Sequence, residues 1–156
     1  MSAIAESSSP PVTASRHRSK ALFSVDAVKA LLGVDEDEVK RMGEDGRLAW
    51  VFNLALDTEH GRAELRFLPQ CVASYLRGQT CSLEWADVLR LLLPNDELII
   101  LSKDITRILN ISGTHTYNLA RRKLIPPLST WHRGRGGCAR FAVRSFVEFL
   151  KSRRFP

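Results

Sequence analysis

The sequence lacks any long hydrophobic run. No stretch of its 156 residues approaches the roughly 18 apolar residues that a membrane helix needs. The longest candidate, Leu89 to Leu93, is short and lies next to charges. The N-terminus has no apolar core of the kind found in signal peptides. We therefore expect a cytoplasmic protein that makes no contact with a membrane.

The sequence has few cysteines, and their spacing forms no paired motif. Cys71, Cys81 and Cys138 are the only cysteines, and no two of them form a C-x-x-C pair. The spacing therefore gives no indication of a zinc site. An odd number of distant cysteines is typical of reduced, buried or incidental thiols, and we expect these three to be of that kind.

The sequence also lacks the motifs of common enzymes. The glycines from Gly134 to Gly137 lie beside arginine and are not followed by Lys-Ser or Lys-Thr, so they do not form a phosphate-binding loop. The four histidines, His17, His60, His115 and His132, are scattered and show no spacing typical of a catalytic set. We predict no enzymatic activity, no cofactor and no metal.

Positive charge is concentrated at one end of the chain. The formal net charge is +6, but residues 98–156 alone hold 12 Lys or Arg and two acids. Residues 22–78 hold 7 basic and 10 acidic residues, and residues 79–97 hold one Arg and four acids. One end of the chain is therefore suited to a polyanion, and the remainder is not.

The basic end has the pattern of two short helices joined by a turn. Ile105, Ile108 and Leu109 lie on one face of a first helix, for which Ser102 is a suitable N-cap. Residues 110–113 break the period and predict the turn. In a second helix, residues 114–123, Leu119 and Ala120 face the core. The residues that then point outward are Thr114, His115, Asn118, Arg121 and Arg122.

A repeat of about 77 residues relates the two halves of the chain. At a shift of 77, Val28, Leu31 and Leu32 coincide with Ile105, Ile108 and Leu109. After the following loop the shift becomes 74, and Arg66-Phe67 coincides with Arg140-Phe141. We infer two copies of one small domain.

The repeat defines the predicted organisation. We expect a disordered tail at 1–21, a first copy at 22–78, a helical linker at 79–97 and a second copy at 98–156. A copy of about 55 residues buries little surface by itself. The linker helix, with Leu83, Val88, Leu91 and Leu92 on its apolar face, should therefore pack the copies together or carry a dimer contact.

Both copies resemble the small winged helix-turn-helix domains of phage excisionases and of AlpA-type and MerR-type regulators. The residues that carry the resemblance in the second copy are Ile108 to Ile111, Leu124 to Pro127, Arg140-Phe141 and the run Phe146, Val147, Phe149 and Leu150. The first copy has Leu31 to Val34, Gly46 to Leu48 and Arg66-Phe67 in the same places. The fold class implied is mostly α with small β wings, that is α+β, with two winged helix-turn-helix domains in tandem.

The resemblance implies a site on double-stranded DNA. In this family the second helix enters the major groove, which implies Thr114, His115, Asn118, Arg121, Arg122 and Lys123. The wing contacts the backbone or the minor groove, which implies Arg133, Arg135 and Arg140. Arg140 has an alternative role as a brace between the wing and the third helix, whereas Trp131 and His132 are expected to pack within the wing.

The first copy departs from this pattern. Its second helix carries five acids, which phosphates would repel, so we expect it to have lost major-groove binding and to contact a partner, a second subunit or the other copy. The main prediction is a bacterial or phage DNA-binding protein of the nucleoid, either a transcriptional regulator or an excisionase-like architectural factor. The alternative is a protein-interaction adaptor on the same scaffold, and RNA stays open as the polyanion.

Overall fold

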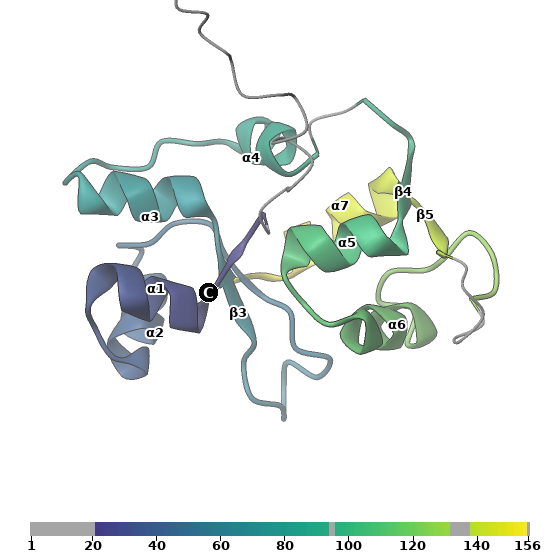
Figure 1. The fold of residues 1–156 in the computed structure, drawn as a ribbon, viewed down its shortest axis with the longest axis horizontal. Coiled ribbons are helices and arrows are strands. Elements are labelled where there is room, and N and C mark those ends of the chain that lie inside the picture. The colour runs from purple at the N-terminus through teal and green to yellow at the C-terminus, as the bar shows by residue number, and fades with distance from the viewer. Residues whose placement is uncertain (1–20, 94–95, 132–137, 156) are drawn as a thin grey trace, which may run out of the picture.

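The computed structural model describes residues 21–93, 96–131 and 138–155. The predicted tail, apart from Ala21, lies outside these residues, as do His132, Arg133 and Arg135 of the predicted wing tip. In the described part the chain forms seven helices and six short strands, and both sheets are antiparallel (Figure 1). The predicted α+β class with small sheets is confirmed.

The first repeat, residues 22–78, contains three helices and three strands. Its elements are β1 (Phe23–Ser24), α1 (Val25–Leu32), α2 (Glu36–Glu44), β2 (Val51–Asn53), β3 (Leu65–Phe67) and α3 (Pro69–Leu76). Two helices begin at side-chain caps: Ser24 accepts from the Ala27 N–H, and Asp35 accepts from the Glu38 N–H. Pro69 occupies the first turn of α3, where the absence of an N–H costs nothing.

The linker and the second repeat, residues 98–156, contain the other elements. These are α4 (Trp85–Leu92), β4 (Ile99–Leu101), α5 (Ser102–Leu109), α6 (Gly113–Arg121), β5 (Arg140–Ala142), α7 (Val143–Ser152) and β6 (Arg154–Phe155). The prediction that Ser102 caps its helix is wrong. Ser102 is the first helical residue, and its buried hydroxyl accepts from the Ala139 N–H instead.

The element bounds reproduce the shifts found in the sequence. Helices α5 and α6 begin and end 77 residues after α1 and α2, and α7 begins 74 residues after α3. The strand register repeats as well, because Phe23 pairs with Phe67 in the first repeat and Ile100 pairs with Phe141 in the second. Both repeats therefore have the same local architecture.

The larger sheet has the strand order β1-β3-β2-β6, and the smaller has β4-β5. Strand β6 is the last element of the second repeat, yet it pairs with β2 of the first: Val51 lies opposite Phe155, and Phe52 lies opposite Arg154. The end of the chain thus completes the sheet of the opposite repeat. The Arg154 guanidinium lies 3.7 Å from the centre of the Trp50 ring, which strengthens this attachment.

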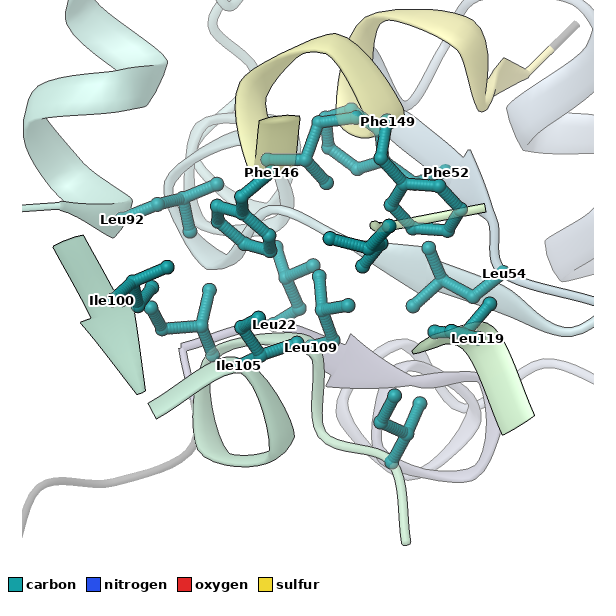
Figure 2. Close-up of a cluster of buried hydrophobic side chains, with 14 of the residues drawn as sticks. Leu22, Phe52, Leu54, Leu92, Ile100, Ile105, Leu109, Leu119, Phe146 and Phe149 are labelled. Atoms are coloured by element: carbon teal, nitrogen blue, oxygen red, sulfur yellow. The ribbon is translucent and has the colours of Figure 1, made fainter. Parts of the chain in front are cut away.

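The larger of two buried clusters is shared between the repeats. Leu22, Phe52 and Leu54 of the first repeat join Leu109 and Phe149 of the second (Figure 2). Val88 and Leu92 of α4 belong to the same cluster, so the predicted role of the linker helix in packing the copies together is confirmed. Leu91 is exposed instead. The smaller cluster lies within the first repeat between its helices and the other face of its sheet.

Two of the cysteines are paired. Cys71 on α3 and Cys81 in the linker form a disulfide, with their Cα atoms 5.3 Å apart, so the prediction of three reduced thiols is wrong. Cys138 is free and exposed. Among the described residues, no helix is long and apolar enough to cross a bilayer.

Candidate nucleic-acid interface

Helices α5 and α6 are joined by a short turn whose geometry is set by two residues. Asn110 ends α5 in the left-handed conformation at φ 55°, and Ser112 caps α6 by accepting from the His115 N–H. The Thr106 and Thr116 hydroxyls meet at 2.7 Å between the helices. Leu119 and Ala120 are buried as predicted, so the helix has one face fixed in the core and another directed outward.

The exposed surface of α6 is basic at its C-terminal end. Thr114, Arg121, Arg122 and Lys123 are exposed, and Asn118 is half-buried. Lys123 follows the helix in the left-handed conformation at φ 58°, where its equivalent Gly46 has φ 83°. Three of the five residues predicted to point outward, Thr114, Arg121 and Arg122, therefore lie on an accessible helix face, with Asn118 at its margin and Lys123 just beyond it.

His115 is the exception, and the prediction that it points outward is wrong. Its Nε2 lies 2.7 Å from the Leu54 carbonyl oxygen, and its Nδ1 lies 3.8 Å from a Glu64 oxygen. Both partners belong to the hairpin of the first repeat, and only 14% of the His115 side chain is exposed. His115 thus anchors α6 to the first repeat and is not available to a base edge.

The basic end of α6 is not neutralised by its surroundings. Arg121, Arg122 and Lys123 take no part in an ion pair with any residue that the structure describes. The charge of Arg122 is felt by one acid, Asp57, but only slightly. The pKa of Asp57 is lowered chiefly by hydrogen bonds from the His60 and Glu59 N–H groups, and the charge of Arg122 contributes least. Three cations therefore face solvent together.

A groove of about 460 Å³ adjoins these cations. It lies between α6 and the segment 126–131, with Arg121 and Lys123 among its lining residues and Trp131 at its other side. The Trp131 ring packs edge-on against Tyr117 at 5.2 Å and also meets Phe141, so Trp131 packs as predicted. The lining mixes these cations with hydroxyl groups of Ser129 and Thr130 and with apolar side chains, so the groove can accept an anionic ligand that also presents apolar surface.

Arg140 has a different environment from its equivalent, Arg66. Arg140 is exposed, and its side chain makes no hydrogen bond or ion pair within the described part of the chain. The Arg66 side chain is only 11% exposed, and its Nε donates to the Leu109 and Asn110 carbonyls at the end of α5. The brace between the wing and the third helix that was predicted as an alternative for Arg140 is not seen among the described residues, and Arg66 instead joins its own repeat to the end of α5 in the other.

The equivalent helix of the first repeat, α2, presents acids that are already paired. Arg47 lies 2.9 Å from Glu38 and 2.8 Å from Asp45, and Arg62 lies 2.8 Å from Glu36. A hydrogen bond from the Arg47 side chain lowers the pKa of Asp45. Although these pairs offset part of the acidity, the helix presents carboxylates where α6 presents cations.

Sequence reasoning did not find His115 or Arg66 as contacts between the repeats. Each has a partner more than 40 positions away in the chain, and no local pattern reveals such a pairing. No group of three or more His, Cys, Asp or Glu that could hold a metal occurs among the described residues. Comparisons with models of known families, with curated proteins and with solved structures gave no match.

Proposed function

We propose that the chain binds double-stranded DNA and that α6 of the second repeat supplies the main contact. The helix would lie in the major groove, with Arg121, Arg122 and Lys123 near phosphates at its C-terminal end. Arg140 and the undescribed Arg133 and Arg135 would contact the adjacent backbone or minor groove. In this proposal the protein acts at the nucleoid in the cytoplasm, as a transcriptional regulator or an excisionase-like architectural factor.

The observation that carries the proposal is the group of three exposed, unpaired cations at the end of a helix packed in a helix-turn-helix. Cations that neutralise phosphates release condensed counterions, and this release supplies most of the non-specific affinity for DNA. Thr114 lies earlier on the same helix, and Asn118 borders the same surface, so polar groups that can read base edges precede the cations.

The proposal is tested by fluorescence anisotropy with a random duplex and with the upstream region of the protein's own gene, across a salt series. About five phosphate contacts predict that log affinity falls with log salt at a slope of roughly −4 to −5. Replacement of Arg121 by glutamate should weaken binding by about ten-fold or more near 0.1 M salt and reduce the slope by about one.

Lys40→Glu is the matched control. Lys40 is exposed on α2, so the change in total charge is the same but falls on the first repeat. Under the proposal this variant binds nearly as well as the unaltered chain. Absence of duplex binding at low salt, or equal losses in the two variants, would show that α6 is not the contact. A preference for the native duplex would make the protein a sequence-specific reader.

The adaptor alternative has one specific observation in its favour, the exposed apolar side chains away from α6. Leu31, Leu76 and Leu98 are each at least half exposed. An adaptor should keep its protein partner when Arg121 is replaced by glutamate, whereas DNA binding should be lost. The two functions are therefore separable with a single variant.

A further inference from the structure

The interface between the two repeats joins two unlike surfaces. The first repeat contributes one face of its sheet, here named the sheet face, which includes Leu22, Phe52 and Arg66. The second repeat contributes its helix face, which includes Ile108 and Phe149 together with the carbonyl groups at the end of α5. The apolar members share one buried cluster, and Arg66 donates to the Leu109 and Asn110 carbonyls.

Backbone hydrogen bonds complete this junction. The N–H groups of Ala21 and Leu22 donate to the Arg107 and Ile108 carbonyls, at 3.4 and 3.1 Å. The Asn110 side chain returns a hydrogen bond to the Leu22 carbonyl. The start of the first repeat therefore runs along the last turn of α5.

Because both repeats have the same architecture, the second repeat should have a sheet face like that of the first, and the first repeat should have a helix face like that of the second. The second repeat has its own sheet face, on which Leu98 and Ile99 are the equivalents of Ala21 and Leu22. Leu98 is 85% exposed and Ile99 is 46% exposed, whereas Leu22 is fully buried. Leu98 and Ile99 are thus exposed because no helix face covers the sheet face of the second repeat.

The same contrast holds elsewhere on that sheet face. The Leu128 N–H donates to the Arg140 carbonyl, which places Leu128 opposite Arg140 as Phe52 is opposite Arg66. Leu128 is 56% exposed, whereas Phe52 is completely buried. Arg140 is likewise exposed where Arg66 is covered.

The first repeat has an unused helix face. Leu31 is the equivalent of Ile108 and is 50% exposed, while Ile108 is 2% exposed. Tyr75 and Leu76 are exposed at the positions of Phe149 and Leu150, which are buried. Gly33 ends α1 in the left-handed conformation that Asn110 adopts at the end of α5, so the carbonyls that would receive an arginine have the same backbone geometry.

These two unused halves account for six of the seven large hydrophobic side chains that are exposed in the described residues, with Leu91 of α4 as the exception. They also lie at opposite ends of the molecule, α1 and α3 at one end and β4 with β5 at the other (Figure 1). The ends have opposite charge, since the first repeat has three more acids than bases and the second has ten more bases than acids.

We propose that the chain binds a second copy of itself head to tail, with the sheet face of one second repeat on the helix face of another chain's first repeat. Arg140 would donate to the Leu32 and Gly33 carbonyls as Arg66 does to those of Leu109 and Asn110. In such an assembly Arg140 contacts the neighbouring chain in place of DNA, and the DNA contact proposed for α6 is left to Arg121, Arg122 and Lys123. Such an interface joins unlike surfaces, so it leaves one half free at each end and allows further chains to add.

The contact between chains is weaker than the one within the chain, for two structural reasons. Trp85 of α4 packs on Trp50 and Phe52 at the internal junction, and β6 adds its strand there. The first repeat has no counterpart of β6, because residues 77–84, which follow α3 as β6 follows α7, form neither helix nor strand. We therefore expect a dissociation constant in the micromolar range or above.

Sedimentation velocity of the nucleic-acid-free protein from about 1 µM to about 1 mM, the range of weak complexes, is the test. The weight-average mass should rise above that of a monomer as concentration increases. Leu128→Asp should abolish the rise by disabling the sheet face, and Leu31→Asp should do so by disabling the helix face. Leu91→Asp is the control, because this exposed leucine lies outside both halves, and it should associate normally.

An equimolar mixture of Leu128→Asp and Leu31→Asp distinguishes this interface from a symmetric one. The first variant keeps its helix face and the second keeps its sheet face, so the mixture should form one-to-one dimers and nothing larger. Leu98→Asp and Leu76→Asp provide a second variant for each face if circular dichroism shows that a first variant is unfolded. A chain that stays monomeric throughout, a mixture that does not dimerise, or a Leu91→Asp variant that fails to associate would overturn the proposal.

Discussion

Replacement of Arg66 by methionine tests whether one arginine holds the two repeats together. Methionine keeps most of the aliphatic stem and removes the guanidinium, so the main loss is hydrogen bonding. The Arg66 Nε donates to the Leu109 and Asn110 carbonyls at 3.2 and 3.0 Å, and one terminal nitrogen donates to the Leu65 carbonyl at 2.9 Å.

The size of the effect follows from the burial of this group. Hydrogen bonds to a charged donor contribute about 1.5–3 kcal/mol each, and such contributions are not additive. The 3.0 Å ion pair with the half-exposed Glu64 adds little. Because the Arg66 side chain is 11% exposed, water can reach this place in the variant and can replace part of the lost hydrogen bonding. We therefore expect Arg66→Met to lower the free energy of unfolding by about 2–4 kcal/mol.

Arg140→Met is the matched control, since it is the same substitution at the equivalent position of the other repeat. Arg140 is exposed, so its replacement should change the free energy of unfolding by less than about 0.5 kcal/mol. Equilibrium urea unfolding of dilute protein, followed by tryptophan fluorescence and by circular dichroism, measures both values. A loss below about 1 kcal/mol for Arg66→Met, or equal losses in the two variants, would refute this account of the junction.

Two further predictions concern the disulfide and the acid range. The bond between Cys71 and Cys81 closes a loop of 10 residues, so its reduction by a dithiol should lower the free energy of unfolding by about 2.5–3 kcal/mol, and an unchanged urea midpoint would contradict this. The pKa values of Asp45 and Asp57 lie below their ordinary value of 3.8, because hydrogen bonds, from the Arg47 side chain and from the His60 N–H respectively, favour the charged forms. Stability from these carboxylates is present above pH 3.8 and is lost as the pH falls through the lowered values, so Asp45→Asn should flatten the decline of thermal midpoint below about pH 4, and an unaltered decline would contradict this.

Local patterns in the sequence were sufficient for the helices and for the repeat. Ile105, Ile108 and Leu109 recur with helical spacing because one face of α5 is buried, and the same cause places Val28 at the equivalent position of α1. The paired Arg-Phe steps mark the strand that precedes the third helix in each repeat. The outward cations of α6 followed from the same spacing.

Contacts between distant segments were beyond this reasoning. His115 was expected to face a ligand because it lies on the polar side of its helix, yet the Leu54 carbonyl is within hydrogen-bond distance of its ring. Ser102 has the chemistry of a cap, but it is buried against Ala139. Strand β6 has only two residues, and its pairing depends on the open edge of β2, which no pattern around Arg154 reveals.

The two repeats show how one backbone can carry opposite surfaces. Glu44, Asp45 and Gly46 occupy the positions of Arg121, Arg122 and Lys123, at the same place after the same turn. Gly46 and Lys123 both have positive φ, and lysine adopts that conformation at a cost that glycine avoids. Lys123 extends the exposed cationic group by one residue in spite of this backbone cost, which agrees with the phosphate contact proposed for this surface.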